Sequence, residues 1–336
     1  MNGEDIAVIG AGSYGTCLAV LFGKAGHRVS LYCRGGEAAA GMEAARENAA
    51  YLPGHPFPET VRVTSDLEEA VGGKRFVFGV TPSHGIREVL GRAAGAMDPE
   101  AIVINASKGL EDGTLKSIDA VYRDVLPAQI AARATYLSGP TFAGELAAGM
   151  PAAIVLAGHD AETSREAQQA LSHLHFRIYT TDDVLGVLIG GALKNVIAIA
   201  AGMSDGLGYG SNTRVALMTR GLAEITRIGV ALGAHAQTFA GLSGMGDLVL
   251  TCAGDASRNR RVGLGLGSGK TMAQILGEMN QVAEGVKTTK VAKELSEKLG
   301  IPAPITETMY AIMHEGVPVR EAIHGLMTRP TRSERD

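Results

Sequence analysis

The stretch Ile6-Ala-Val-Ile-Gly-Ala-Gly-Ser-Tyr-Gly15 decides the fold, because it joins an apolar run to the pattern Gly10-x-Gly12-x-x-Gly15. In a dinucleotide-binding loop, Gly10 permits a tight turn, Gly12 lets the backbone approach a pyrophosphate, and Gly15 lets the next helix pack closely on the strand. A glycine-rich turn without a ligand is the alternative. The context favours the loop, since a strand precedes it and an expected helix over Thr16–Lys24 follows it, before a second strand. The stretch therefore predicts a dinucleotide site in a Rossmann fold.

Short apolar runs continue to alternate with helical stretches up to about residue 180. This alternation predicts a mostly parallel sheet with helices on both faces. We expect strands at Ile6–Ile9, Val29–Tyr32, Val61–Val63, Phe76–Val80, Ile102–Ile104, Thr135–Leu137, Ala153–Leu156 and Arg177–Tyr179. After Thr181 only long helix-period segments follow, so we expect an α/β Rossmann-type domain over residues 1–181 and an all-α domain over residues 182–336.

The overall composition argues against several classes of function. The chain has 336 residues, of which 46% are apolar and 20% charged, and its formal net charge is -4, so no general attraction to nucleic acid or to an anionic membrane is expected. Aromatic residues make up 4% with no Trp, which argues against stacking of single-stranded nucleic acid. The nine His and three Cys show no metal-ligand spacing, and so few cysteines indicate free thiols in a reducing compartment.

Two features of the sequence bear on where the protein resides. Glu4 and Asp5 stand where a signal peptide would carry a basic start before an apolar stretch. The most apolar helical stretch, Val184–Ala201, is interrupted by two glycines, a lysine and an asparagine, which favours a buried helix over a membrane span. We therefore expect a cytoplasmic protein without membrane insertion.

Arg34 follows the second expected strand, about twenty residues after the glycines, where an NAD-specific site offers an acidic residue to the ribose hydroxyls. An arginine at this place is typical of sites that accept a 2′-phosphate, and its guanidinium can also stack on the adenine ring. A solvated surface arginine is the alternative. The position favours NADPH over NADH without excluding NADH.

Further motifs follow later strands or lie in the helical part of the chain. They are Val80-Thr-Pro-Ser-His-Gly-Ile-Arg87, Asn105-Ala-Ser-Lys-Gly-Leu-Glu111, Ser138-Gly-Pro-Thr-Phe-Ala-Gly-Glu145, Gly190-Gly-Ala-Leu-Lys-Asn195, Gly244-Met-Gly-Asp-Leu248 and Asp255-Ala-Ser-Arg-Asn-Arg-Arg261. In this order, and as far as Leu326-Met-Thr-Arg-Pro330, they resemble the bacterial-type NAD(P)-dependent glycerol-3-phosphate dehydrogenase family. The resemblance implies reversible reduction of dihydroxyacetone phosphate to sn-glycerol 3-phosphate for glycerophospholipid synthesis, by a homodimer.

Lys194 is the candidate general acid/base. It lies three and four residues after Gly191 and Gly190 on its expected helix, so it would project over a patch without side chains that a substrate or nicotinamide ring can approach. Desolvation would lower the pKa of its ammonium and let it exchange a proton with a carbinol oxygen. An isolated buried lysine more often extends to solvent. The resemblance, however, implies that this lysine protonates the carbonyl oxygen.

The resemblance implies two further catalytic residues. Lys108, in a loop just past a strand end, is expected to contact substrate and cofactor and to polarise the carbonyl group. Asp247 follows two conformationally permissive glycines and is expected to hydrogen-bond a substrate hydroxyl and to orient the catalytic lysine. A plain helix N-cap before Leu248 is the alternative for Asp247.

A protein of net negative charge needs local cations to hold a phosphate. The last motif predicts a capped helix start with Arg258 and Asn259 in its first turn, where a bidentate guanidinium and free N–H groups form a phosphate cradle. The resemblance implies that Ser257, Arg258 and Asn259 hold the substrate and that Arg258 also reaches the cofactor. A solvated basic face explains Arg260 and Arg261 better. By resemblance alone, the other contacts are Gly139 and Thr141 to the substrate, and Ser13, Tyr14, Ala143, Val282 and Glu284 to the cofactor.

Two other interpretations remain open at this point. 6-Phosphogluconate and 3-hydroxyacid dehydrogenases share the Rossmann half, the helical half and a catalytic Lys with a neighbouring Asn, but they lack the string Ser257–Arg261 at this position. A regulatory protein that binds a nicotinamide dinucleotide without catalysis would need only the first domain. The presence of Lys194, Lys108, Asp247 and Arg258 therefore favours an enzyme.

Overall fold

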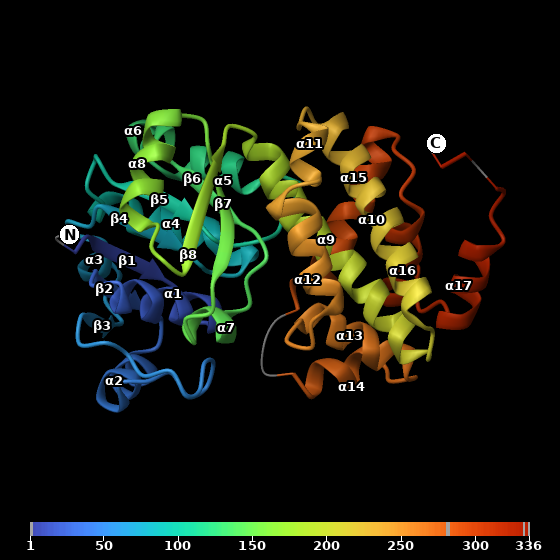
Figure 1. The fold of residues 1–336 in the computed structure, drawn as a ribbon, viewed down its shortest axis with the longest axis horizontal. Coiled ribbons are helices and arrows are strands. Elements are labelled where there is room, and N and C mark those ends of the chain that lie inside the picture. The colour runs from blue at the N-terminus through green and yellow to red at the C-terminus, as the bar shows by residue number, and fades with distance from the viewer. Residues whose placement is uncertain (1–2, 280–282, 332, 335–336) are drawn as a thin grey trace.

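The computed structural model describes residues 3–279, 283–331 and 333–334, which form a half built around a sheet and a helical half (Figure 1). Among these residues, eight strands form one sheet in the order β3-β2-β1-β4-β5-β6-β7-β8. The strands are β1 (Asp5–Ile9), β2 (Arg28–Tyr32), β3 (Val61–Thr64), β4 (Phe76–Gly79), β5 (Ile102–Asn105), β6 (Thr135–Ser138), β7 (Ala152–Gly158) and β8 (Phe176–Thr181). Neighbouring strands are parallel except β6 and β7, which confirms the expected mostly parallel sheet.

Strand β1 is apolar at successive positions because helices cover both faces of the sheet. Ile6 and Val8 pack into one core with α1 (Ser13–Lys24), whereas Ala7 and Ile9 pack into the other core with α3 (Leu67–Val71), α4 (Ile86–Ala93) and α5 (Ile118–Val125). A strand buried on both faces needs this continuous apolar run. The helices of this half are α1 (Ser13–Lys24), α2 (Gly36–Ala45), α3 (Leu67–Val71), α4 (Ile86–Ala93), α5 (Ile118–Val125), α6 (Ala128–Ala132), α7 (Ala143–Ala147) and α8 (Ala161–Leu171), with short 3₁₀ turns η1 (Ser83–Gly85) and η2 (Ala94–Ala96).

The carboxyl ends of β1, β4, β5 and β6 lie at the same edge of the sheet, because these strands are parallel neighbours. The glycine loop and the motifs that begin near Val80, Asn105 and Ser138 follow these ends. Ligands of open α/β sheets bind at this edge. The topology thus brings four separate motifs to one side of the sheet.

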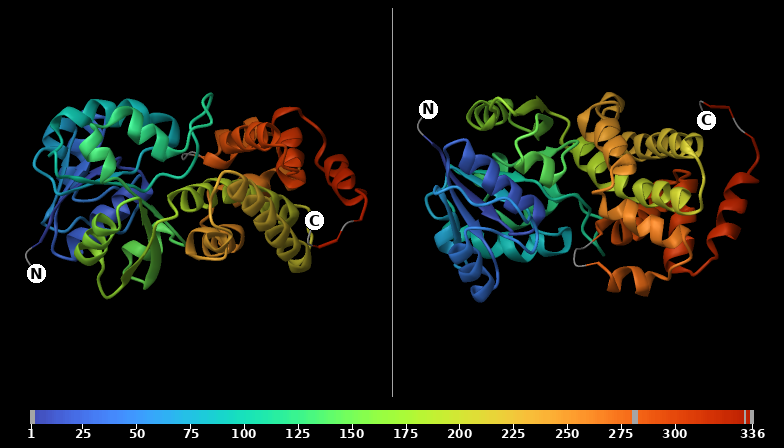
Figure 2. Two further views of the ribbon diagram at one scale, coloured as in Figure 1. Left: turned by 90° about the horizontal axis from the view of Figure 1, so that it is seen from above. Right: turned by 60° about the horizontal axis from the view of Figure 1, so that its bottom comes forward.

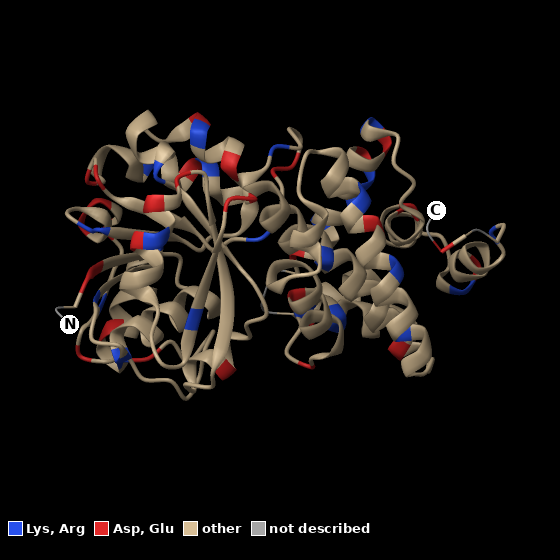
Figure 3. Cartoon of the chain, turned by 45° about the horizontal axis from the view of Figure 1, so that its top comes forward, with Lys and Arg blue, Asp and Glu red and all other residues tan. Residues whose placement is uncertain are grey.

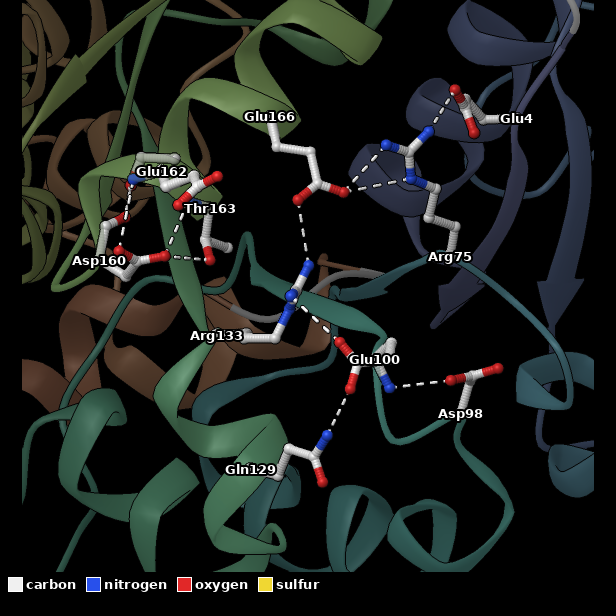
Figure 4. A network of polar contacts seen from close by, with 11 residues as sticks. Glu4, Arg75, Asp98, Glu100, Gln129, Arg133, Asp160, Glu162, Thr163 and Glu166 are labelled. Atoms are coloured by element: carbon white, nitrogen blue, oxygen red, sulfur yellow. Dashed lines mark hydrogen bonds and ion pairs between the residues drawn. The ribbon is translucent and has the colours of Figure 1, made fainter.

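The opposite edge of the sheet carries a network of charged side chains (Figure 4). Arg75, just before β4, pairs with Glu4 at 2.7 Å and with Glu166 at 2.9 Å. Arg133, just before β6, pairs with Glu166 at 3.1 Å and with Glu100 at 3.3 Å. These pairs tie together the amino ends of the central strands. The charged network therefore lies at the edge of the sheet away from the motifs, where partly exposed ion pairs add little stability.

The helical half begins with α9, which leads from the sheet into the second core in both views of Figure 2. Val184, Val187 and Leu188 pack against the sheet, and the residues from Ile189 onward enter the helical core. Within the described part of the chain, α9 is the helix whose length and apolarity would suit a membrane span, but 94% of that stretch is buried, as in a core helix. The elements are α9 (Val184–Gly206), α10 (Ser211–Ala231), α11 (Ala236–Phe239), a π-helical turn η3 (Leu242–Gly246), α12 (Asp247–Ala253), α13 (Arg258–Gly267), α14 (Met272–Gly277), α15 (Glu284–Leu299), α16 (Pro304–His314) and α17 (Val319–Met327).

Helices α9 and α13 cross with their backbones almost in contact. A Cβ atom on Gly202 would lie 2.0 Å from the carbonyl oxygen of Arg260, and one on Gly263 would lie 2.0 Å from that of Ile199. Only glycine permits so close an approach. The crossing places the start of α13, with its arginine, against the middle of α9.

Charges of both signs are interspersed over the two halves in the view of Figure 3. The formal net charge of the chain is -4. An anionic ligand must therefore be held by individual cations and N–H groups within the site.

Candidate functional site

The glycine loop has the geometry of a dinucleotide cradle. Gly10 has φ +121°, and a Cβ on Gly15 would lie 1.8 Å from the carbonyl oxygen of Gly10, so both positions require glycine. A Cβ on Gly12, in contrast, would have no atom within 4 Å. Helix α1 begins at Ser13, three residues before the expected start, and no side chain caps it. Its free N–H groups face an open space that suits a pyrophosphate, so the residues present fit the cofactor.

Replacement of Gly12 by Val tests this cradle. Gly12 has φ -75°, which valine also adopts, so we expect Tm to change little while the affinity for NADPH falls by roughly tenfold or more, because the side chain fills the open space. Gly15→Val is the matched control, in which the clash with Gly10 should lower Tm. Fluorescence titration and thermal unfolding measure the two effects. NADPH affinity at the wild-type level in Gly12→Val would exclude this loop as the pyrophosphate site.

The predicted cofactor contacts beside the loop lie at the same edge of the sheet. The hydroxyl of Ser13 donates to the carbonyl oxygen of Tyr51 at 2.8 Å. The phenol of Tyr14 accepts a hydrogen bond from the Thr141 hydroxyl at 3.1 Å, and this bond joins two of the predicted site residues. Arg34 is exposed just after β2 and makes no ion pair with any described residue. Its guanidinium is therefore available to a ligand.

A buried carboxylate joins two lysines from opposite halves of the molecule. Asp247, 1% exposed, accepts hydrogen bonds from Lys194 of α9 and, at 2.5 Å, from Lys108 of the loop after β5. Lys108 also donates to the carbonyl oxygen of Gly139 at 3.3 Å. Lys194 is 5% exposed, and burial lowers its pKa to about 7, although the charge of Asp247 opposes this shift. Three predicted catalytic residues thus meet between the two halves.

The N-cap interpretation of Asp247 is wrong. Asp247 is the first residue of α12, the N-cap position belongs to Gly246, and no side chain caps the helix. The carboxylate instead turns to the two lysines, because the preceding π-helical turn brings it beside α9. Its side chain thus serves the buried cluster and leaves the helix end uncapped.

The expected open patch beside Lys194 is also wrong. A Cβ on Gly190 would lie 2.8 Å from the carbonyl oxygen of Ser243, and one on Gly191 would lie 2.8 Å from Oγ of Ser138. Protein therefore occupies the space beside both glycines. The two glycines let η3 and the end of β6 approach α9 closely, and this packing sets Asp247 beside the lysine.

Thr251 also belongs to the lysine cluster, the buried group formed by Lys108, Lys194 and Asp247, although the sequence did not identify it. Its hydroxyl accepts a hydrogen bond from Lys194 at 2.6 Å and donates to the backbone carbonyl oxygen of Asp247 at 2.6 Å. The available signal was its position four residues after Asp247, which places both side chains on one face of a helix. Thr251 therefore helps to hold the ammonium of Lys194.

The start of α13 packs beside Asn195, the residue that follows Lys194 in α9. Ser257 is the N-cap of α13, and Arg258 and Asn259 lie in its first turn, as expected. Ser257 accepts a hydrogen bond from the backbone N–H of Arg260 at 3.2 Å. Asn259 donates to Asn195 and accepts from the backbone N–H of Gly285, both at 2.9 Å.

Arg258 differs from the nearby Arg260 in its lack of an ion-pair partner among the described residues. Among the described residues its guanidinium forms no hydrogen bond or ion pair, and burial lowers its pKa, opposed by the charge of Glu284. Arg260 was expected on a solvated face, but its side chain is only 11% exposed and pairs with Asp205 and Asp255, both at 2.7 Å. Arg261 also has no ion pair among the described residues, but it is exposed, so Arg258 is the partly buried arginine of this string that is free to bind an anion.

Of the remaining predicted contacts, Glu284 joins the two halves. Glu284, at the start of α15, accepts a hydrogen bond from the hydroxyl of Ser83 after β4 at 2.9 Å, a link between the halves that the sequence did not indicate. Ala143 begins α7, and Val282 lies outside the described residues. In the described ranges, no group of three or more His, Cys, Asp or Glu is arranged to hold a metal ion. The arrangement can bind a dinucleotide, hold an anion and move a proton.

Comparisons with known proteins identify the relatives of the chain. Residues 5–164 match the family described as NAD-dependent glycerol-3-phosphate dehydrogenase N-terminus, and residues 183–324 match the corresponding C-terminus. A glycerol-3-phosphate dehydrogenase (NAD(P)+) of Geobacter metallireducens is 52% identical over 333 residues, 99% of each chain. One from Geobacter sp. strain M21 is 50% identical over 98% of this chain and 99% of that protein. The crystal structure of glycerol-3-phosphate dehydrogenase from Coxiella burnetii, 36% identical, superposes with a TM-score of 0.92 over 97% of this chain and 99% of that one.

Proposed function

Because the chain belongs to the NAD-dependent glycerol-3-phosphate dehydrogenase family, we propose that it reduces dihydroxyacetone phosphate to sn-glycerol 3-phosphate, reversibly, between its two halves. The chain is an NAD(P)-dependent dehydrogenase. The observation that carries the proposed site is the buried Asp247 carboxylate, which holds one lysine from each half. The carboxyl ends of the central strands and the start of α13 border this point.

Lys194 is the proposed general acid. The nicotinamide, when bound, supplies the hydride that the carbonyl carbon takes up. Lys194 then gives its proton to the carbonyl oxygen, which becomes the hydroxyl group of the product, and it takes the proton back in the reverse direction. Asp247 and Thr251 hold the ammonium, and its pKa of about 7 suits proton transfer near neutral pH. Lys108, on the second oxygen of Asp247, adds positive charge that polarises the carbonyl group.

Arg258 is the proposed phosphate ligand. Its side chain is partly buried and its guanidinium has no hydrogen-bond partner among the described residues, so a phosphate would supply the missing acceptors. The start of α13 adds backbone N–H groups and a favourable dipole. Ser257 and Asn259 are proposed to complete the substrate contacts, together with Gly139 and Thr141.

The proposed cofactor site runs from the glycine loop to the start of α15. Gly10, Gly12 and Gly15 shape the cradle, and the exposed Arg34 favours NADPH by its charge toward a 2′-phosphate. NADH remains a second cofactor in this proposal. The further proposed contacts are Ser13, Tyr14, Lys108, Ala143, Arg258, Val282 and Glu284.

We also propose a domain division, an oligomeric state and a cellular location for the protein. We divide the chain into a dinucleotide-binding domain of residues 1–181 and a substrate domain of residues 182–336, which agrees with the end of β8 at Thr181 and the start of α9 at Val184. We also propose a homodimer in the cytoplasm that supplies glycerol 3-phosphate for glycerophospholipids. The reducing cytoplasm suits the free cysteines Cys17, Cys33 and Cys252.

The pH dependence of the reaction tests both substrate and general acid. Reduction needs the ammonium form of Lys194, so kcat/KM for dihydroxyacetone phosphate is expected to fall as pH rises through about 7. Oxidation of glycerol 3-phosphate needs the neutral amine, so its kcat/KM is expected to rise over the same range. The change in reduced-nicotinamide absorbance measures both rates.

Substrate choice provides the control for this experiment. Purified protein is assayed in parallel with 6-phosphogluconate and 3-hydroxyisobutyrate, the substrates of dehydrogenases with the same two-part plan. A higher kcat/KM for either acid than for glycerol 3-phosphate would contradict the proposed substrate. Parallel pH profiles for reduction and oxidation would contradict the role of Lys194.

A further inference from the structure

The loop between β5 and α5 carries Lys108 and is attached to both halves of the molecule. Lys108 meets Asp247 of the helical half. Leu110, two residues later, is 5% exposed and belongs to the core of the helical half rather than to either core of the sheet. Leu115 packs against the same core. The helical half therefore holds the loop by apolar contacts on both sides of Glu111.

Glu111 attaches the loop to the sheet half. Its carboxylate accepts two hydrogen bonds from Arg87, from Nε at 2.7 Å and from Nη2 at 2.9 Å, and a third from the hydroxyl of Thr114 at 2.6 Å. Arg87 belongs to α4, which Ile86 and Leu90 anchor in a core of the sheet. A bidentate arginine fixes both the position and the orientation of a carboxylate. The loop is thus tied to a rigid helix at the residue three places after Lys108.

The backbone of the loop depends on this attachment. The N–H of Glu111 donates to the carbonyl oxygen of Lys116 at 3.0 Å, and the N–H of Leu115 donates to the carbonyl oxygen of Glu111 at 3.1 Å. Leu115 has φ +58°, a left-handed conformation that a residue with a branched side chain rarely adopts. Such a conformation persists only where the surroundings enforce it. The contacts of Glu111, the burial of Leu110 and the packing of Leu115 against the helical core supply that enforcement.

We propose that Arg87 is a positioning residue, which holds the loop through Glu111 so that the ammonium of Lys108 meets Asp247 across the two halves. This inference rests on the proposed function of Lys108. Arg87 touches neither substrate nor cofactor in this account and acts only through the loop. Arg87 and Glu111 are the last residues of the motifs that begin at Val80 and Asn105. In this proposal, their contact gives both residues a role.

The Arg87–Glu111 pair is less exposed on its acidic side than the neighbouring ion pairs of Asp124. The Glu111 side chain is 14% exposed, and its contact with Arg87 lowers the pKa of that carboxyl below its usual value. Asp124, in contrast, is one-third exposed, and it pairs with Arg87 at 2.8 Å and with Lys116 at 2.6 Å on the outer side of the loop. Exposed pairs contribute little to stability. Asp124→Asn thus offers a control that leaves the bidentate contact in place.

The test is a double-mutant cycle on Arg87→Gln and Glu111→Gln, with Lys108→Met as the reference. We expect each single variant to lower kcat/KM for dihydroxyacetone phosphate by about 10- to 100-fold, as a displaced catalytic group does. The double variant is expected to equal the singles, because both break one contact. Asp124→Asn should retain wild-type kcat/KM.

A second readout separates positioning from general damage to the fold. The charge of Lys108 lowers the pKa of Lys194, so displacing the loop should raise the pH at which reduction declines, as Lys108→Met also should. Thermal unfolding checks that the variants are folded. If Arg87→Gln does not fold, Glu111→Gln carries the test, since its amide oxygen still accepts a hydrogen bond from Thr114.

Three results would overturn the inference. Wild-type kcat/KM in the folded Arg87→Gln and Glu111→Gln variants, with Lys108→Met impaired, would refute the role of Arg87 and leave the proposed function intact. Additive losses in the double variant, or an unchanged pH profile, would likewise refute action through the loop. Wild-type kcat/KM in Lys108→Met would instead refute the proposed role of Lys108 itself.

Discussion

Lys194→Met is expected to retain NADPH binding and to lower kcat for dihydroxyacetone phosphate by between about 100- and 10,000-fold, the usual contribution of a general acid. The fold should persist, because Asp247 keeps Lys108 as a partner and no buried carboxylate is left unpaired. Fluorescence titration with NADPH and steady-state kinetics measure the two effects.

Lys290→Met is the matched control, since Lys290 lies on the same helical half with half of its side chain exposed. It should behave like the wild type in both assays. Turnover by Lys194→Met at the wild-type rate would remove this lysine from the mechanism. Loss of NADPH affinity to the same extent as turnover would assign Lys194 to cofactor binding instead.

Arg258→Ala is expected to raise KM for dihydroxyacetone phosphate by about 10- to 100-fold, because hydrogen bonds to a charged group are worth about 1.5–3 kcal/mol each. The free protein should lose little stability, since the guanidinium has no hydrogen-bond partner among the described residues and its burial already disfavours the charge. Steady-state kinetics and thermal unfolding check both expectations.

Two controls define the phosphate interaction. Arg261→Ala removes an exposed arginine of the same string and should leave KM near the wild-type value. Dihydroxyacetone, which lacks the phosphate, should be reduced equally poorly by wild type and Arg258→Ala. An equal loss on both substrates in Arg258→Ala would show that Arg258 serves something other than the phosphate.

Local sequence patterns were sufficient to predict the strands and the glycine loop. The run Ile6–Ile9 is apolar at every position, and that pattern reports burial on both faces of a sheet. Gly10 and Gly15 each meet a steric requirement that a single sequence can display. The direction of β7 against β6 was not available in this way, because pairing direction depends on contacts between distant strands.

The geometry of the lysine cluster lay beyond local patterns. Lys108 and Asp247 are separated by 139 residues, and only the fold brings them together. Gly190 and Gly191 looked like an open surface, yet protein from η3 and β6 fills the space beside them, and periodicity cannot distinguish a gap for ligand from a gap for protein. Arg260 was misjudged for the same reason, because its partner Asp205 comes from another helix.

The most direct test of the proposed reaction is the loss of reduced-nicotinamide absorbance when dihydroxyacetone phosphate is added to NADPH and the purified protein, run in parallel with Lys194→Met. We predict a rapid loss in the wild type, matched mole for mole by sn-glycerol 3-phosphate, and almost none in the variant. Stable absorbance in the wild type with both NADPH and NADH, or equal rates in the two proteins, would contradict it.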